Sequence, residues 1–410
     1  MRTIEEVRAQ ILSTVRPTSE ETVGLPEAIG RVLYTQVVAP HDVPSFTNSA
    51  MDGFAVRASD VGSPGAILEI IEELAAGETA STPVQEGEAI KIMTGAPMPD
   101  GADTVVRVED TSVEEGKVHI AVAAELGTSV RLPGGDVRAG STVFPPGVRL
   151  TPAHVGVLAT LGVTRPAVSR RPMVAVMSTG DELLPPETRE LTPGKIRDSN
   201  RPMILGLIDD AGAEPLDLGR VPDDANSLRS ALGEAAANSD MIVTSGGVSM
   251  GEYDVTKMVL EEEANVEFYP VAMKPGKPQG FGTLGGVPFF GLPGNPVSVL
   301  VSFEQFVRPA ILRMQGAVAL LRPRVMGVTE EELVSDPGKE EFLRVRFVAG
   351  DPELRVAKTG GEGSHVLSGA ANADAFAVLG RGIERVPPGD AVILELFRAM
   401  ETRTVTDDGA

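Results

Sequence analysis

Two lysines three residues apart, Lys274 and Lys277, lie in the sequence Lys-Pro-Gly-Lys-Pro. Two prolines and a glycine restrict the backbone there, so both ammonium groups can converge on one anion. A surface turn with solvated lysines would use the same residues. However, the chain has 36 Lys and Arg against 58 Asp and Glu, a formal net charge of −22. In so acidic a protein, a rigidly presented lysine pair favours an oxyanion site.

A glycine-rich segment, SGGVSMGEYD, begins at Ser245 and directly follows an apolar run. Gly246 and Gly247 would allow backbone N–H groups to approach a phosphate closely. The same glycines could simply form a tight turn between a strand and a helix. Glu252 and Asp254 follow, and acids beside an anion site make chemical sense when a hard cation such as Mg²⁺ bridges them to a phosphate or oxyanion.

Three further polar turns allow both a structural and a functional interpretation. Asn295, in Gly-Asn-Pro, predicts a helix start whose free N–H groups could also hold an anion. Glu182, in Thr-Gly-Asp-Glu, and Asp223, in an Asp-Asp pair, could be ligands or ordinary acids at helix starts. The N-terminal half adds NSAMDGFA, MTGA and RLPGGD, each of which could be only a turn.

The residue types that are missing or rare restrict the chemistry. The chain has no cysteine, which excludes disulfides, thiolate zinc sites, iron–sulfur clusters and cysteine nucleophiles. Its four histidines are scattered, which argues against a histidine-built metal site. Catalytic groups and metal ligands must therefore come mainly from Asp, Glu, Lys, Ser and Thr, and a bound metal would be a hard cation.

The same composition restricts the partners and the location. The negative charge argues against nucleic acid and anionic membranes as partners. No apolar run approaches the roughly 18 residues of a membrane helix, and the N-terminus lacks the features of a signal peptide. The sequence predicts a soluble, cytoplasmic protein.

An alternation of apolar strands and helices in the middle of the chain would position these motifs. We expect strands at residues 173–177, 215–218, 240–244, 266–272 and 288–292, and helices at 200–211, 225–237, 254–263 and along 299–314. This alternation predicts a parallel sheet with helices on both faces, which binds ligands beyond the carboxyl ends of its strands. Three of these strand ends carry TGDEL, SGGVSMGEYD and LPGNPVS, so the candidate site should lie there.

The flanking regions have other patterns. Residues 1–15 predict an amphipathic helix, and short apolar runs between Gly and Pro turns at 68–148 predict a small β domain. Apolar runs at 342–348, 355–358, 375–379 and 391–397 predict a C-terminal β domain. The predicted class is α/β plus β, in a multidomain chain.

Eight motifs in this order resemble the molybdopterin molybdenumtransferase family, called MoeA in bacteria, and the E domain of gephyrin. They are NSAMDGFA, MTGA, RLPGGD, STGDEL, SGGVSMGEYD, KPGKP, LPGNPVS and GSH. The resemblance covers essentially the whole chain and implies an elongated homodimer of four-domain subunits. It places an N-terminal helical domain at 1–50 and 139–171, a β-rich insertion at 51–138, a molybdopterin-binding-like α/β domain at 172–320 and a β-barrel-like domain at 321–410.

The resemblance also implies a reaction. Adenylylated molybdopterin and molybdate would be the substrates, Mg²⁺ the cofactor, and AMP and molybdenum cofactor the products. Matched by motif, Asp254, Asp52, Asp136, Glu182 and Asp223 would be catalytic, with Glu182 and Asp223 on the nucleotide and Mg²⁺ side. The substrate-binding residues would be Thr94, Arg131, Ser249, Lys274, Lys277, Gly246, Gly247, Asn295, Arg344 and Ser364.

Two other functions use the same features. The adenylyltransferase of the preceding step, which is also a possible partner, has a fold that resembles the middle region; the flanking domains and KPGKP argue against it. A non-catalytic scaffold is the second alternative, because gephyrin clusters receptors. The complete set of acids and the lack of an added linker region argue against that alternative.

Overall fold

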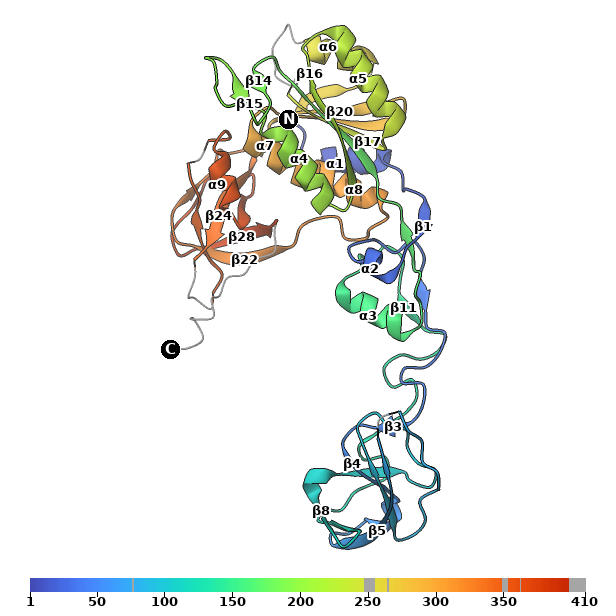
Figure 1. The fold of residues 1–410 in the computed structure, drawn as a ribbon. Helices are drawn as coiled ribbons and strands as arrows, with labels where there is room; N and C mark the ends of the chain where they lie inside the picture. The colour runs from blue at the N-terminus through green and yellow to red at the C-terminus, as the bar shows by residue number, and fades with distance from the viewer. Residues whose placement is uncertain (76, 247–254, 264, 349–352, 362, 398–410) are drawn as a thin grey trace.

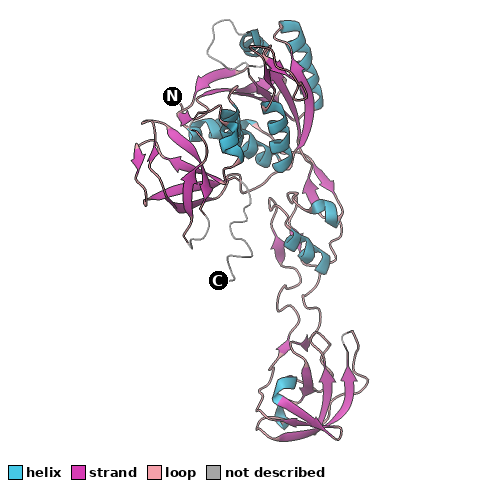
Figure 2. Cartoon of the chain, turned by 60° about the vertical axis from the view of Figure 1, so that its left-hand side comes forward, coloured by secondary structure: helices cyan, strands magenta, loops and turns pink. Residues whose placement is uncertain are grey.

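The protein is an elongated molecule in which an N-terminal β-sheet lies far from a central α/β region and a C-terminal barrel (Figures 1 and 2). We describe a computed structural model that covers residues 1–410 except 76, 247–254, 264, 349–352, 362 and 398–410. Helix α1 (Ile4–Thr14) packs on the central region, as Ile4, Val7 and Ile11 are buried in its core. The chain then leaves for the N-terminal sheet and returns.

The central sheet has the strand order β16-β13-β17-β21-β20-β18. Its first four strands are parallel, which confirms the prediction for this part: β16 (Glu214–Val221), β13 (Met173–Thr179), β17 (Met241–Ser245) and β21 (Val287–Leu292). The other two, β20 (Pro278–Leu284) and β18 (Glu267–Pro270), are antiparallel, so the sheet is mixed rather than fully parallel.

Strand β20, which is joined to β21 by a two-residue turn, was missed in the sequence because glycines interrupt its apolar pattern. Gly285 and Gly286 both have positive φ, the conformation of a tight turn between antiparallel strands. Gly282 lies within β20 where a Cβ would be 2.4 Å from the carbonyl oxygen of Asn265. Glycines at such positions interrupt the apolar pattern that identifies a strand.

Helices cover both faces of the central sheet, as predicted. Side chains alternate along β13, so that Val174 and Val176 face one core while Ala175 and Met177 face the other. The first core includes α1, α4 (Asn200–Asp210), α7 (Pro296–Ser302) and α8 (Arg308–Met314). The second includes α5 (Ala225–Asn238) and α6 (Val255–Glu263).

The helix expected along 299–314 contains a π-helical segment, η3 (Phe303–Val307), between α7 and α8. The polar residues Glu304 and Gln305 are buried along with Phe303 and Phe306. The reason is that this helix lies between the central sheet and the barrel, so both of its sides are covered (Figure 1). Single π-helical turns of this kind occur mostly within α-helices.

The C-terminal region forms a closed five-stranded barrel. Strands β24 (Glu340–Phe347), β25 (Arg355–Lys358), β22 (Arg324–Thr329), β28 (Ala391–Leu396) and β26 (Ala375–Leu379) pair in that order, and β26 returns to β24. This confirms the predicted β-barrel-like domain. A short strand of the central region, β19 (Met273–Lys274), is added to β24 in parallel.

The N-terminal half first forms a small connecting unit and then a six-stranded sheet. In the unit, β1 (Glu20–Thr22) pairs with β12 (Ala167–Ser169) beside α2 (Leu25–Ala28) and α3 (Pro152–Thr160). The six-stranded sheet has the order β7-β4-β6-β5-β9-β8, as expected for this β-rich region. Its strands are β4 (Gly53–Val56), β5 (Ala66–Leu74), β6 (Glu88–Ile92), β7 (Thr104–Arg107), β8 (Thr111–Glu114) and β9 (Lys117–Ile120).

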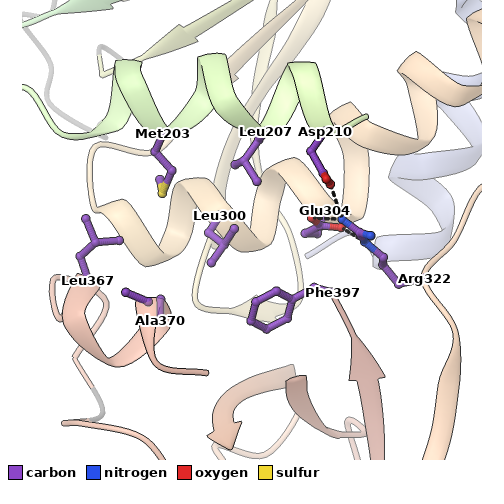
Figure 3. A pocket seen from close by; sticks show the side chains of 10 residues that line it. Met203, Leu207, Asp210, Leu300, Glu304, Arg322, Leu367, Ala370 and Phe397 are labelled. Atoms are coloured by element: carbon purple, nitrogen blue, oxygen red, sulfur yellow. Dashed lines mark hydrogen bonds and ion pairs between the residues drawn. The ribbon is translucent and has the colours of Figure 1, made fainter. Parts of the chain in front are cut away.

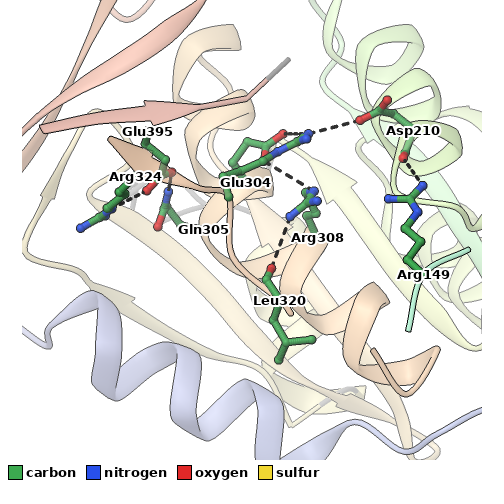
Figure 4. A network of polar contacts seen from close by, with 9 residues as sticks. Arg149, Asp210, Glu304, Gln305, Arg308, Leu320, Arg324 and Glu395 are labelled. Carbon is green, nitrogen blue, oxygen red and sulfur yellow. Dashed lines mark hydrogen bonds and ion pairs between the residues drawn. The ribbon is translucent and has the colours of Figure 1, made fainter. Parts of the chain in front are cut away.

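Polar contacts centred on the buried Glu304 and Gln305 join the central helices to the barrel and its connecting segment (Figure 4). Arg322 donates to Glu304 through Nε at 2.9 Å and Nη2 at 3.1 Å, and Arg322 also contacts Asp210 at 3.2 Å. Burial, and then the charge of Arg322, lower the pKa of Arg308 to about 10. On the barrel side, Glu395 accepts from Gln305. These contacts hold the barrel against η3.

Replacing Glu304 by Gln should therefore destabilise the protein strongly. The side chain of Glu304 is 1% exposed, and its loss of charge leaves two arginines without their buried counter-charge. We expect a loss of about 3–5 kcal/mol in the free energy of unfolding, measured by urea denaturation with circular dichroism. Glu267→Gln, at an exposed pair with Arg2, is the control and should cost less than about 0.5 kcal/mol. Equal losses in the two variants would contradict this role of Glu304.

Candidate functional site

The four parallel strands of the central sheet end together, and their polar loops meet at that edge. Ser178 of β13 is in register with Ser245 of β17, and Ser245 is in register with Leu292 of β21. On the other side, Thr179 is in register with Val221 of β16. The loops that begin at Gly180, Gly246 and Gly294 therefore start side by side, as the sequence predicted.

Asn200, the first residue of α4, ties two of these loops together. Its Nδ2 donates to Ser245 Oγ at 2.8 Å and to the carbonyl oxygen of Gly294 at 2.7 Å. Its Oδ1 is buried and has no hydrogen-bond partner among the described residues. Sequence reasoning missed Asn200, although an Asn at the start of a helix that follows a site loop was an available signal.

A buried carboxylate, that of Asp198, connects the elements that form this edge. Asp198 is 3% exposed and accepts from Ser178 Oγ at 2.7 Å. Arg201 donates to Asp198 through its amide and its Nε, both at 3.1 Å, and extends to Asp217 on β16. This network fixes the start of α4 against β13 and β16, and it too was not predicted.

The two acidic turns after β13 and β16 are joined. The amide of Asp181 donates to Asp223 Oδ2 at 3.0 Å. Asp224, not Asp223, caps α5, because its Oδ1 accepts from the amides of Asn226 and Ser227. Glu182 precedes the short strand β14 (Leu183–Leu184), not a helix, and is exposed. The helix-start explanation therefore applies to neither Glu182 nor Asp223, and both remain available to a ligand.

Gly246 stands where only glycine fits. Its φ is +96°, and a Cβ would lie 2.5 Å from the carbonyl oxygen of Thr179. The backbone of the β17 loop thus approaches the β13 loop closely. The other predicted residues of this segment, Gly247, Ser249 and Asp254, lie outside the described residues.

The two lysines differ in their surroundings. Lys274 pairs with Glu341 at 3.1 Å and with Asp336 at 3.3 Å, whereas Lys277 is exposed. Burial lowers the pKa of Lys274, but hydrogen bonds and charges from Glu341 and Asp336 outweigh it, so the net shift is upward. Lys274 is firmly cationic and already has counter-charges, which the sequence did not indicate.

The barrel supplies a loop to the same edge. The amide of Val297, in the first turn of α7, donates to the carbonyl oxygen of Ser364 at 3.0 Å. Arg344 is 7% exposed and donates to the carbonyl oxygens of Gly361 and Gly363, so it holds this loop in place. Asn295 occupies the N-cap position of α7, but its side chain makes no capping hydrogen bond, contrary to the expected cap.

The N-terminal residues form a separate group. Asp52 accepts from the amide of Thr94 at 2.6 Å and from its Oγ1 at 2.7 Å. Arg131 pairs across β10 (Val130–Arg131) with Asn48 of β3 (Asn48–Ser49) and contacts the carbonyl oxygen of Ala50 at 3.5 Å. For Asp136, the structure records its amide, which donates to Val43. Figure 1 places this sheet at the far end of the molecule from the central loops.

A cavity of about 680 Å³ lies away from this edge (Figure 3). It lies between α4, α7, α9 (Leu367–Ala371) and the barrel, with Met203, Leu207, Leu300, Leu367 and Phe397 as its apolar walls. None of the predicted site residues lines it. Within the described ranges, no cluster of three or more Asp, Glu or His side chains could hold a metal ion by itself.

Comparison with known proteins gives matches along the whole chain. Three family models match: "MoeA N-terminal region (domain I and II)" at residues 2–162, "Probable molybdopterin binding domain" at 175–313 and "MoeA C-terminal region (domain IV)" at 327–397. The chain is 36% identical to a molybdopterin molybdenumtransferase of Haemophilus influenzae over 97% of this chain and 99% of that protein. It is 41% identical to molybdopterin molybdenumtransferase 2 of Mycobacterium tuberculosis over 84% and 87%.

A solved structure is also similar over its full length. The crystal structure of the molybdopterin biosynthesis moeA protein from Pyrococcus horikoshii matches with a TM-score of 0.85 and 29% identity, over 97% of this chain and 100% of that one. The same order of domains is therefore found in a protein of related sequence.

Removing the Asn200 side chain should loosen two loops at once. Asn200→Ala loses both donated hydrogen bonds, so the free energy of unfolding should fall by about 1–3 kcal/mol. Amide hydrogen exchange, measured by mass spectrometry, should become faster around both Ser245 and Gly294. Asn238→Ala removes a similar bond, to Glu234 at the end of α5, and should leave both loops unchanged. Faster exchange at only one loop would show that Asn200 does not join them.

The pKa of Asp52 should depend on Thr94. The backbone hydrogen bond of Thr94, followed by its side-chain bond, lowers the pKa of Asp52. Because the folded-state value lies below the unfolded one, this interaction stabilises above the unfolded pKa and is lost as pH falls through the folded pKa. Thr94→Val should raise the pKa of Asp52 in an NMR titration and leave that of Asp224, lowered by Ser227, unchanged. An unchanged pKa of Asp52 in the Thr94→Val variant would contradict the hydrogen-bond explanation.

Proposed function

The chain belongs to the MoeA family of molybdopterin molybdenumtransferases, and from this premise we propose that it inserts molybdate into adenylylated molybdopterin with Mg²⁺ and releases AMP. It is a transferase of molybdenum cofactor biosynthesis. The observation that carries the finer proposal is the meeting of the TGDE, SGG, GNP and GSH loops at one edge of the central sheet. We also propose the four-domain division expected from the sequence.

Molybdate is a tetrahedral dianion, which suits the basic side of this edge. Lys277 is exposed, and Lys274 lies on β19 beside the barrel, so both ammonium groups can be presented to an anion. We also assign Gly246, Gly247 and Asn295 to substrate binding. The pterin dithiolene sulfurs take up the metal, and a protein without cysteine has no thiolate to compete for it.

The nucleotide belongs on the acidic side. Glu182 and Asp223 are exposed, and the bond from Asp181 to Asp223 holds their two loops together. One or two carboxylates plus substrate phosphates are the usual protein ligands of Mg²⁺, so this donor set fits the ion. Bound there, Mg²⁺ would neutralise charge on the phosphoanhydride. We assign to Asp254 the acid required for insertion.

The N-terminal group, Asp52, Thr94, Arg131 and Asp136, needs a second subunit to reach this edge. In one chain, it lies at the opposite end of the molecule (Figure 2). We propose a homodimer in which the N-terminal sheet of one subunit faces the central loops of the other. A twofold axis would then create two equivalent shared sites.

The location and further partners are also proposals. No described helix is long and apolar enough to cross a membrane. We propose a cytoplasmic enzyme that receives its substrate by contact with the adenylyltransferase of the preceding step.

The decisive experiment is incubation of the protein with adenylylated molybdopterin and Mg²⁺, with and without molybdate. We expect AMP release that depends on molybdate and the formation of active cofactor. An adenylyltransferase would instead consume Mg-ATP and release pyrophosphate. A scaffold would release neither product, and that result would overturn the proposal.

Lys277→Ala should weaken molybdate use without destabilising the fold. Lys277 is exposed and is expected to contribute one charged contact, so we expect the KM for molybdate to rise about three- to tenfold. The melting temperature should stay the same, whereas Lys274→Ala should lower it by leaving buried Glu341 unpaired. Lys117→Ala, which removes one positive charge on the N-terminal sheet, is the control and should leave the KM unchanged. An unchanged KM in Lys277→Ala would remove Lys277 from the molybdate site.

A further inference from the structure

Two carboxylates surround Lys274, and both come from the barrel side. Lys274 Nζ lies 3.1 Å from Glu341 Oε1 and 3.3 Å from Asp336 Oδ2. Asp336 precedes β24, and Glu341 is the second residue of that strand. An oxyanion that binds Lys274 must therefore compete with charges that the protein itself supplies.

Glu341 cannot leave easily. Its side chain is 6% exposed, and its Oε2 accepts from the amide of Asp336 at 3.1 Å. Lys274 and Glu341 are also paired in register between β19 and β24. Moving Glu341 away would bury an unpaired carboxylate, which is costly. Glu341 thus holds Lys274 in its place beside β24.

Asp336 has the opposite properties. Its side chain is 53% exposed, it lies outside any strand, and its Oδ2 is shared between Lys274 and Lys339, each at 3.3 Å. An exposed ion pair of this kind is weak, because water readily replaces either partner. Asp336 can therefore swing into solvent and expose Lys274 at little cost.

The local charges favour the replacement of Asp336 by an anion beside Lys274. Lys274 and Lys339 together balance Asp336 and Glu341, so the group is neutral while Asp336 is in place. When Asp336 leaves, the group that remains carries one positive charge, which attracts an anion. A carboxylate that returns to Lys274 also helps the anion to depart.

We propose that Asp336 is an internal competitor for the oxyanion at Lys274 and so sets the affinity of the site for molybdate. This inference rests on the proposed function, since it takes Lys274 as an anion-binding residue. A purely structural role for Asp336, that of fastening the loop to β19, predicts the opposite effect of its removal, namely weaker binding and lower stability.

Asp336→Asn in the full-length protein separates these roles, because Asn keeps the size and removes the charge. We expect molybdate to bind about two- to fivefold more tightly in equilibrium dialysis, which is the range for one exposed ion pair. The KM for molybdate should fall by the same factor with kcat unchanged. Weaker or unchanged binding would overturn the inference.

Glu332→Gln is the matched control, since it removes one charge from another exposed ion pair of the same domain, with Arg385 at 3.2 Å. It should leave molybdate binding unchanged. An equal gain in affinity in Glu332→Gln would show that the effect of Asp336→Asn comes only from the change in overall charge. Lys274→Met distinguishes a failure of this inference from a failure of the proposed function. If it weakens molybdate binding while Asp336→Asn changes nothing, only the competitor role fails. If Lys274→Met itself changes nothing, the assignment of Lys274 in the proposed function fails too.

Discussion

The separation of the N-terminal sheet from the central sheet is the constraint on which the functional organisation depends. The chain runs out through the connecting unit, forms the sheet that carries Asp52 and Thr94, and returns, so this sheet is joined to the rest only through that unit (Figure 1). A single chain cannot bring both groups of polar residues to one substrate in this arrangement. We propose that a second subunit supplies the other group, so that the proposed shared site would follow from the shape of each chain rather than from any special contact within it.

At the central edge, the fold uses small residues and backbone groups to bring the loops together. Gly246 permits a close approach to Thr179, and Asn200 joins the loops of β17 and β21. The barrel adds Ser364 and the carboxylates around Lys274, and the buried pair of Glu304 with Arg322 keeps that barrel in place. The site is therefore a junction of two domains, and its charges can be balanced or released there by small movements of exposed side chains such as Asp336.

Much of this fold could be predicted, because apolar periodicity reports burial directly. The strands around Val174 and Val243, the helices on both faces and the C-terminal barrel strands follow from that pattern. Strand β20 does not, since its glycines are selected by close backbone contacts. For the site, motif order located the loops, but it could not tell which of Asp223 and Asp224 caps a helix. The partners of Lys274 were also hidden, because Asp336 and Glu341 are distant in sequence and approach only when β19 joins the barrel.

The shared site is the central claim, and complementation between two inactive proteins tests it most directly. Asp52→Ala and Asp254→Ala chains, carrying different tags, would be co-expressed and the mixed dimers purified through both tags. One shared site of each mixed dimer carries both changes, and the other carries neither. Random assembly makes about half of all dimers mixed, so roughly a quarter of the wild-type molybdate-dependent activity should return in the unfractionated mixture. Purified mixed dimers that remain inactive would contradict the account and place the whole site within one chain.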